Sequence, residues 1–253
     1  MKYILHTVVF IFLISDCRAQ RVPPEIVKSY HRIVRLIREN KANELAAMVQ
    51  YPLKRKNPLP DIANAKQFIA NYNILFGDEF RKKLKLYNDS DIFEHNVGYG
   101  LVGGPFNGDM WVDESGKITG ITYNSAKQIE LMNQITKKIQ RQIYPGVNTW
   151  KENILVCKSA KLLIRIDWTD KGLRYVCWTK GRPTSEKPDL ILYNGTEEAQ
   201  GTMGGWTWTF KNGDWTYVVD DVEMAETDDK VGLFLRLLFK DVEKSSIRLT
   251  EIK

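Results

Sequence analysis

Cysteine and histidine are scarce in this chain. Three of its 253 residues are cysteine and three are histidine. Three cysteines are too few for a fold built on disulfides or for several zinc sites, and three histidines, one of them in the N-terminal leader, leave little for metal-dependent or histidine-based catalysis. The remaining composition, 43% hydrophobic and 27% charged, is that of a globular protein and excludes collagen-like, low-complexity and disordered chains.

Familiar hydrolase and nucleotide-binding motifs are also missing. There is no G-x-S-x-G nucleophile elbow, no G-x-x-x-x-G-K-[ST] phosphate loop and no G-x-G-x-x-G fingerprint. His31 and His95 lack an H-x-x-x-H or C-x-x-C partner, and the carboxylates between Asp220 and Asp229 do not have the spacing of an EF-hand loop. We therefore expect no metal and no cofactor, and the sequence favours a non-catalytic protein.

Residues 1–19 have the organisation of a secretory signal peptide. Lys2 supplies a short basic region, Ile4–Ile14 is a mostly apolar stretch too short to span a bilayer, and small residues, Cys17 and Ala19, occupy the positions that signal peptidase inspects. An uncleaved anchor and lipid attachment at the cysteine are the alternatives. We expect cleavage after Ala19 and a secreted or periplasmic mature chain with no transmembrane segment.

The chain changes character near Trp150. In the mature chain up to that residue, basic residues outnumber acidic ones 19 to 13, and helical spacing gives way to short alternating strands. The remainder is predicted to be β throughout, with Asn194-Gly195 and Asn212-Gly213 as two-residue hairpin turns. The predicted fold class is α+β, with an α+β domain over residues 20–147 and an antiparallel β-barrel or sandwich over residues 148–253.

Helix start signals are clear in the first domain. Asn64-Ala65-Lys66-Gln67 and Ser125-Ala126-Lys127-Gln128 each place a capping residue three positions before a glutamine. A further helix is predicted from Glu25, because apolar residues recur at helical spacing, at Ile26, Tyr30, Ile33 and Ile37. Short strands are expected at residues 92–95, 99–102, 109–112 and 117–123.

Cys157 and Cys177 are the cysteines that remain after removal of the leader. An oxidising compartment favours a disulfide between them, and we predict one. A plain meander of three strands would instead place them roughly 10 Å apart, which is too far for a bridge. The predicted disulfide therefore requires that the sheet curl or that the first and third strands be neighbours.

Five of the seven tryptophans lie between Trp168 and Trp215, and they concentrate in one predicted hairpin. With Asn212-Gly213 as its loop, one face carries the pairs Phe210 with Trp215, Trp208 with Tyr217, and Trp206 with Val219. We favour the interpretation that this face is barrel core. The alternative is a recognition surface for sugar rings or a protein, with the candidate binding residues Trp206, Trp208, Trp215 and Tyr217.

Basic residues gather in three clusters of the first domain, namely Lys28, Arg32, Arg35 and Arg38, then Lys54-Arg55-Lys56, and then Arg81-Lys82-Lys83 with Lys85. Such clusters are most often solvated faces. Their functional interpretation is an anionic partner, which could be a glycan, an anionic lipid surface or a nucleic acid. Export makes nucleic acid the least favoured of these, and we expect no nucleic-acid partner.

Residues 24–143 resemble the cone-shaped fold of the nuclear transport factor superfamily. The resemblance rests on the order of helices and strands and on Tyr51-Pro52-Leu53, Phe68, Tyr72, Phe76-Gly77 and the region Gly98–Gly104. It implies an apolar hollow between helices and a curved sheet. An alternative function follows, a small-molecule enzyme in which His95, with Asp91 or Glu94, acts as a base near Trp111.

Residues 151–253 resemble the small exported β-barrels that include periplasmic lysozyme inhibitors. The residues that carry this resemblance are Tyr175-Val176-Cys177-Trp178, Lys187-Pro188-Asp189-Leu190, Asn194-Gly195 and Gly204-Gly205. It implies an inhibitor-like binding role, and no functional residue is transferred from either family. The leading hypothesis is an exported, non-catalytic binding protein for an envelope or extracellular protein or glycan. A structural module of an envelope complex, docking through its basic face, is a further alternative.

Overall fold

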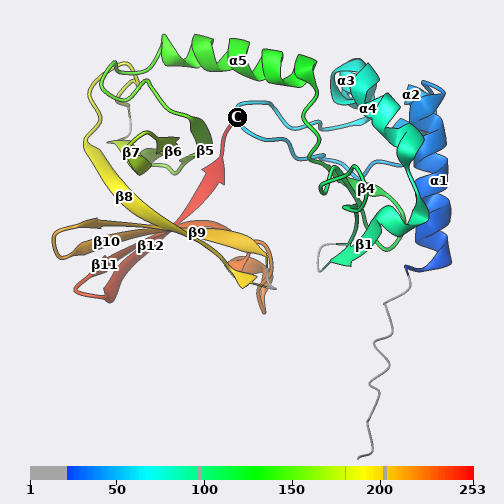
Figure 1. Cartoon of the computed structure of the whole chain (residues 1–253). Coiled ribbons are helices and arrows are strands. Elements are labelled where there is room, and N and C mark those ends of the chain that lie inside the picture. Colours follow the sequence, from blue (N-terminus) through cyan, green and yellow to red (C-terminus); the bar gives the residue numbers. More distant parts are fainter. Residues whose placement is uncertain (1–21, 96–97, 180, 202–203) are drawn as a thin grey trace, which may run out of the picture.

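The structure is a computed structural model that describes residues 22–95, 98–179, 181–201 and 204–253 (Figure 1). The signal peptide predicted at residues 1–19 lies outside the described residues. Within the described ranges, no helix combines the length and the apolar character needed to cross a membrane.

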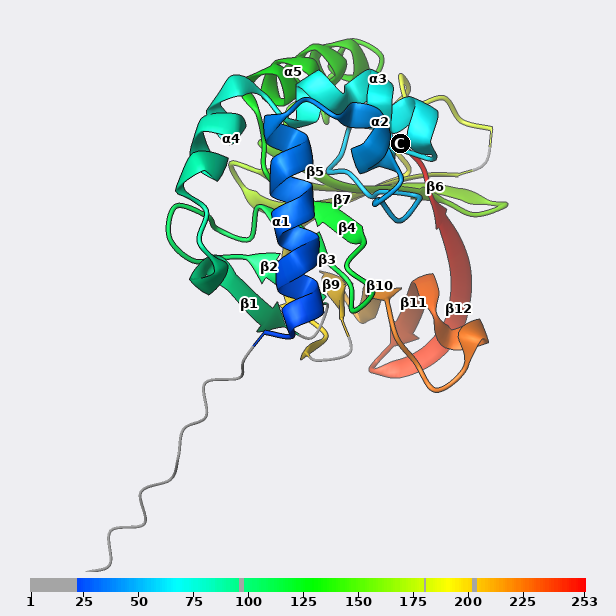
Figure 2. The ribbon, with the colours of Figure 1, turned by 90° about the vertical axis from the view of Figure 1, so that its right-hand side faces the viewer.

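The first part of the chain combines helices with a small antiparallel sheet of order β1-β2-β3-β4. Its elements are α1 (Pro24–Arg38), α2 (Ala42–Ala46), α3 (Ala65–Leu75), α4 (Asp78–Lys83), η1 (Leu84–Leu86), η2 (Asp89–Asp91), β1 (Ile92–His95), β2 (Gly98–Leu101), β3 (Met110–Val112) and β4 (Ile118–Ile121). Helix α1 lies across the sheet (Figure 2). It buries Tyr30, whose hydroxyl donates to the carbonyl oxygens of Tyr99 at 2.8 Å and Met110 at 3.1 Å. The mixed architecture is confirmed, whereas the cone shape stays a prediction.

The predicted helix starts are present at α3 and α5 (Ala126–Gln140). The Asn64 side chain accepts from the backbone N–H of Gln67 at 3.0 Å, and Ser125 Oγ accepts from Gln128 N–H at 3.1 Å. The Gln128 side chain does not complete a capping box, because its Oε1 accepts from Arg55 Nη2 at 3.1 Å. The second start signal therefore also ties α5 to the loop that precedes α3.

The second part of the chain is a closed antiparallel barrel of order β10-β11-β12-β5-β6-β7-β8-β9. Its strands are β5 (Glu152–Lys158), β6 (Leu162–Thr169), β7 (Gly172–Thr179), β8 (Leu190–Ala199), β9 (Gly205–Asn212), β10 (Trp215–Val222), β11 (Gly232–Phe239) and β12 (Val242–Glu251), with the short turn η4 (Asp228–Lys230) before β11. Between the two predicted alternatives, barrel and sandwich, the structure is a barrel.

The hairpin turn predicted at Asn194-Gly195 is wrong. These residues lie inside the continuous strand β8, where Leu173 pairs with Gly195 and Arg174 with Tyr193, so Asn194 is an unpaired bulge residue with φ 57°. A bulge bends a strand. The first half of β8 pairs with β7 and the second half with β9, so the bend helps the sheet close.

The predicted register of the aromatic hairpin is shifted by two residues. Asn212 pairs with Trp215, so the loop is Gly213-Asp214. Gly213 has φ 60°, which matches the glycine preference at the first position of a type II′ turn. Because side chains alternate, a shift of two residues keeps the aromatic row on one face of the sheet.

The predicted disulfide is absent, and Cys157 and Cys177 are free, buried thiols. They lie on β5 and β7, on either side of β6, and both pair with Ile164. Two strand spacings separate them by roughly 10 Å, beyond the reach of a bridge. Barrel closure brings β12 and not β7 next to β5, so the first and third strands are not neighbours. The sheet does curl, but the curl of the closed barrel leaves the two thiols unbridged.

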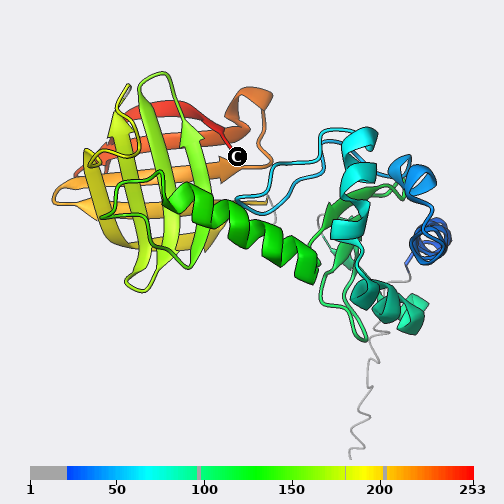
Figure 3. The ribbon, with the colours of Figure 1, turned by 90° about the horizontal axis from the view of Figure 1, so that it is seen from above.

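Helix α5 and the segment after it connect the two parts (Figure 3). Ile143 and Val147 pack with Val176 and Trp178 on the outer face of the barrel. The predicted boundary between residues 147 and 148 falls in this connector. The loop before α3 also contacts the barrel, through Lys56 with Glu152 at 2.7 Å, Asn57 Nδ2 with the Ile154 carbonyl at 2.8 Å, and Asp61 with Lys253 at 2.6 Å.

Candidate functional site

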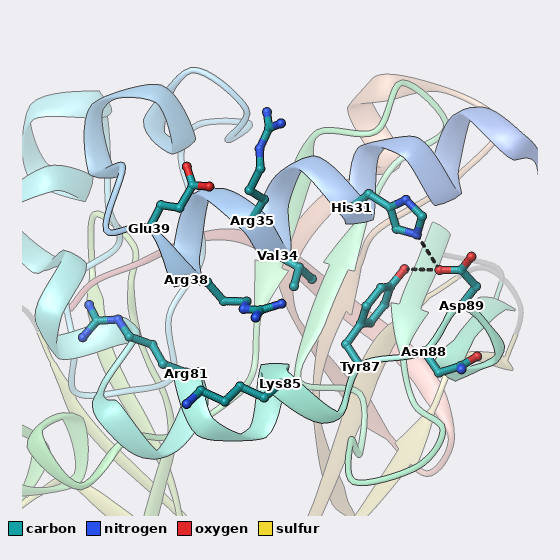
Figure 4. A pocket seen from close by; sticks show the side chains of 10 residues that line it. All are labelled: His31, Val34, Arg35, Arg38, Glu39, Arg81, Lys85, Tyr87, Asn88 and Asp89. Atoms are coloured by element: carbon teal, nitrogen blue, oxygen red, sulfur yellow. Dashed lines mark hydrogen bonds and ion pairs between the residues drawn. The ribbon is translucent and has the colours of Figure 1, made fainter.

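A cleft of about 800 Å³ lies between the C-terminal half of α1 and the segment from α4 to η2 (Figure 4). We call it the basic cleft, and its cationic side chains are Arg35 and Arg38 from α1, Arg81 from α4 and Lys85 from η1. Arg38 and Lys85 reach into it from opposite walls (Figure 4). The fold thus brings together two of the three basic clusters recognised in the sequence.

Arg81 is held rigidly at one wall of the basic cleft. Its guanidinium carbon lies 5.5 Å from the centroid of the Tyr72 ring, and its Nη atoms donate to Asp78 at 3.3 Å and Asn73 at 3.2 Å. Its Nε is buried and has no hydrogen-bond partner among the described residues. A guanidinium whose orientation is fixed by packing loses less entropy when it binds a ligand than a free side chain does.

The other three cations are free to meet a ligand. Across the described part of the chain, no carboxylate oxygen lies within the 4.0 Å ion-pair distance of Arg35, Arg38 or Lys85. Two carboxylates line the cleft, Glu39 and Asp89. The cations therefore outnumber the anions, and several unpaired positive charges that share one hollow attract anions from solution.

The remaining wall is a hydrogen-bonded group of three side chains. Asp89 Oδ1 lies 2.7 Å from His31 Nε2 and accepts from the Tyr87 hydroxyl at 3.0 Å. The hydrogen bond from His31 holds the pKa of Asp89 below its usual value, and burial, with the Asp89 charge, raises the pKa of Tyr87. The phenol is therefore protonated at neutral pH, and its ring is fixed at the edge of the basic cleft.

The structure divides the predicted aromatic binding residues between core and rim. Trp208 and Phe210 are buried in the barrel core, which Tyr217 also contacts, whereas Trp206 is 44% exposed and Trp215 37% exposed at opposite ends of the hairpin. The interpretation that this face is barrel core therefore fits Trp208, Phe210 and Tyr217 in the middle of the hairpin. Trp206 and Trp215, at its two ends, are exposed and available to a partner.

One open end of the barrel, which we call the acidic mouth, encloses about 470 Å³. Trp168, Trp206 and Trp208 line it, together with the carboxylates Glu152, Glu197, Asp221 and Glu251. Trp208 Nε1 donates to Glu197 at 2.8 Å, and burial, with Glu223 nearby, raises the pKa of Asp221. Of these residues, the sequence indicated Trp206 and Trp208 as binding candidates and Asp221 only as part of an acidic segment. The four carboxylates were not grouped in the sequence because they come from four different strands.

The residues of the alternative enzyme pocket are only partly brought together. His95 and Trp111 are in contact, with ring centroids 5.9 Å apart, but His95 is exposed. Asp91 is buried and its Oδ2 accepts from the Asn88 N–H at 2.8 Å, so it caps η2. Asp91 ends η2 directly before β1, and His95 ends β1 four residues later, an extended separation of roughly 13 Å, so this carboxylate does not orient that imidazole.

Metal-ligating side chains do not converge in the described ranges. No group of three or more His, Cys, Asp or Glu residues there has an arrangement that could hold a metal ion. The basic cleft offers no such set either, and its chemistry is that of anion recognition through several points of contact. No family model, no curated protein and no solved structure matches this chain.

Proposed function

We propose that this protein is an exported, non-catalytic binding protein whose basic cleft holds an anionic glycan. The observation that carries the proposal is the convergence of unpaired cations from two distant segments, Arg38 of α1 and Lys85 of η1, on one cleft beside the fixed guanidinium of Arg81. A guanidinium group binds a carboxylate or a sulfate group through two parallel hydrogen bonds. A lysine ammonium on its flexible side chain adds a further positive charge.

The shape and lining of the cleft favour a sugar polymer over a compact ion. A volume of about 800 Å³ exceeds what one small anion needs. The ring of Tyr87 at its edge offers the flat, partly apolar surface on which sugar rings pack, with a hydroxyl beside it. The predicted signal peptide would bring the chain to the compartment where envelope and extracellular polysaccharides occur.

The experiment is retention of the mature chain on immobilised polygalacturonate, with dextran as the neutral control matrix. Wild type should be retained at low salt and released as salt rises, because surface charges are screened. The variant R38E/K85E should flow through. The matched control K137E/K138E makes the same change of charge on exposed positions of α5 and should be retained. Equal retention of both variants, or retention on dextran, would refute a charged site in the cleft.

Non-catalysis is tested with the same polymer. After long incubation with the protein, the chain length of the polygalacturonate should be unchanged by size-exclusion chromatography. A shift to shorter chains that disappears in R38E/K85E would show that the basic cleft is an active site.

A second candidate function is supported by the acidic mouth. Exposed Trp206 among the carboxylates Glu197, Asp221 and Glu251 suits a basic protein partner, in line with the inhibitor-like interpretation. The test is a lysozyme inhibition assay, in which wild type would slow cell-wall lysis and Trp206→Ala would not. Lysis at the uninhibited rate with wild type would remove lysozyme as the partner.

A further inference from the structure

A second pocket, of about 220 Å³, lies where the end of α5, the loop before α3 and the outer face of the barrel meet. Its walls are mainly apolar, and the side chains that matter most are Pro58, Ile139, Ile143, Leu163, Trp178 and Ile252. Arg165 of β6 also lines it. We call this pocket the interface pocket, and it is separate from both the basic cleft and the acidic mouth.

Arg165 is buried to an extent unusual for a charged residue, with 4% of its surface exposed. Its guanidinium carbon lies 3.8 Å from the centroid of the Trp150 ring, and its Nε donates to both oxygens of Asp167 at 2.8 and 2.9 Å. Its Nη2 is buried and has no hydrogen-bond partner in the part of the chain that the structure describes. A buried donor without a partner is costly, so this atom is poised to gain from an acceptor.

The buried charges around Arg165 do not balance. Asp167 is fully buried and also accepts from Arg174 Nη2 at 2.8 Å and from Asn153 Nδ2 at 3.1 Å. Arg174 is 3% exposed, so one carboxylate faces two buried guanidinium groups. Lys253, which also lines the pocket, has its ammonium paired with Asp61 at 2.6 Å. The buried cluster therefore carries one positive charge in excess, and an unbalanced buried charge is destabilising unless an anion compensates it.

The geometry points to the interface pocket as a binding site for a small monocarboxylic acid, with its carboxylate on Arg165 and its apolar body against the pocket walls. A volume of about 220 Å³ corresponds to roughly seven water molecules, below the usual size of drug-like pockets. The ligand is therefore short, of the size of hexanoate or benzoate. The carboxylate supplies the missing negative charge, and burial of the apolar body selects against acids that lack one.

The experiment is a thermal unfolding titration of the mature chain with hexanoate and with benzoate. Both should raise the Tm saturably, because a ligand that binds only the folded state stabilises it. The neutral analogues hexanamide and benzamide should raise it far less. Acetate and chloride serve to detect an anion effect without an apolar body. A similar rise with acetate or chloride, or with the amides, or no rise with either acid, would overturn the proposal.

Three variants assign the effect to the pocket. Arg165→Met should weaken the affinity for the acids by at least roughly tenfold, as expected for loss of a charged hydrogen bond. Ile139→Trp fills the pocket and leaves Arg165 in place, so it should abolish the response even if Arg165→Met folds poorly. Ile129→Trp is the control on the exposed start of α5 and should respond like wild type. Wild-type affinity in both Arg165→Met and Ile139→Trp would refute this site.

This proposal and the proposed glycan function can fail separately. The variant R38E/K85E leaves the interface pocket intact and should keep the full response to hexanoate. Arg165→Met leaves the basic cleft intact and should keep retention on polygalacturonate.

Discussion

Replacing Asp167 by asparagine is the perturbation that most directly probes the buried charges of the barrel. The carboxylate has no exposed surface and accepts from Arg165, Arg174 and Asn153. Asparagine has nearly the same shape but no charge, so two buried guanidinium groups are left uncompensated. Removing one partner of a buried ion pair costs about 3–5 kcal/mol, which corresponds to a fall in Tm of roughly 6–20 °C for a chain of this size.

Arg165→Met should cost much less than Asp167→Asn. Methionine retains apolar contact with Trp150, and the variant leaves Asp167 and Arg174 as a balanced pair. Two contacts are lost. The stacking of the guanidinium on the tryptophan is worth about 0.5–2 kcal/mol. The hydrogen bonds of Arg165 Nε to Asp167 are also lost, but both oxygens of this carboxylate keep a donor, in Asn153 and Arg174. A larger loss of unfolding free energy in Asp167→Asn than in Arg165→Met would therefore indicate an excess of buried positive charge.

The assay is urea unfolding of the mature chain, monitored by tryptophan fluorescence. Urea is preferred to guanidinium chloride because the latter is a salt and screens charges. Asp170→Asn is the matched control, since Asp170 pairs with Lys151 at 3.0 Å on the surface and both side chains are mostly exposed. Its cost should be about 1 kcal/mol or less. If Asp167→Asn costs no more than Asp170→Asn, or no more than Arg165→Met, the buried charge imbalance is refuted.

Three further predictions concern pH, thiols and packing. Burial alone would raise the pKa of Asp61, but hydrogen bonds from two lysine ammonium groups and a backbone N–H lower it overall, so its contribution to stability is present above about pH 4 and is lost as the pH falls through the lower folded pKa. Asp61→Asn should therefore reduce stability at pH 7, measured by urea unfolding, and its effect should shrink as the pH falls below about 4. Burial raises the pKa of both Cys157 and Cys177, so Ellman's reagent should detect two thiols only after unfolding, and a reductant should leave the Tm unchanged. Gly195→Ala would place a Cβ 2.3 Å from the Phe210 ring and should cost about 1–3 kcal/mol in the same unfolding assay, and a neutral effect would contradict the packing of β8 against this ring.

Local patterns in the sequence were sufficient to predict most elements. The capping residues Asn64 and Ser125 each place a helix at the observed start, and the repeat of apolar residues in α1 places its start within one residue, at Glu25 instead of Pro24. Strand β1 has the predicted bounds of residues 92–95. These features depend on residues within a few positions of one another, so no tertiary information is needed to find them.

Predictions that depended on tertiary context were less successful. An Asn-Gly pair favours both a hairpin turn and a bulge residue with positive φ, and only the pairing of β8 with two different neighbours decides between them at Asn194-Gly195. The prediction of a Cys157–Cys177 disulfide was wrong, because barrel closure places β12, and not β7, next to β5. Both outcomes depend on which strands become neighbours, and a single sequence does not contain that information locally.

For the candidate sites too, the local features could be predicted from the sequence, whereas the tertiary arrangement could not. The basic clusters around Arg38 and Lys85 were visible in the sequence, but their meeting in one cleft depends on how α1 packs beside α4 and η1. The buried charge cluster did leave a signal. Arg165 and Asp167 lie two residues apart on one face of a strand whose other face is apolar, and such charges on a central strand are unexpected unless they pair.

Calorimetric titration of a galacturonate hexamer into the mature chain, at 50 and 200 mM salt, measures whether the basic cleft binds an anionic glycan. We expect a single saturable site whose affinity falls at the higher salt and drops at least roughly tenfold in R38E/K85E. Binding of equal strength by that variant, or no binding by wild type at 50 mM salt, would contradict it.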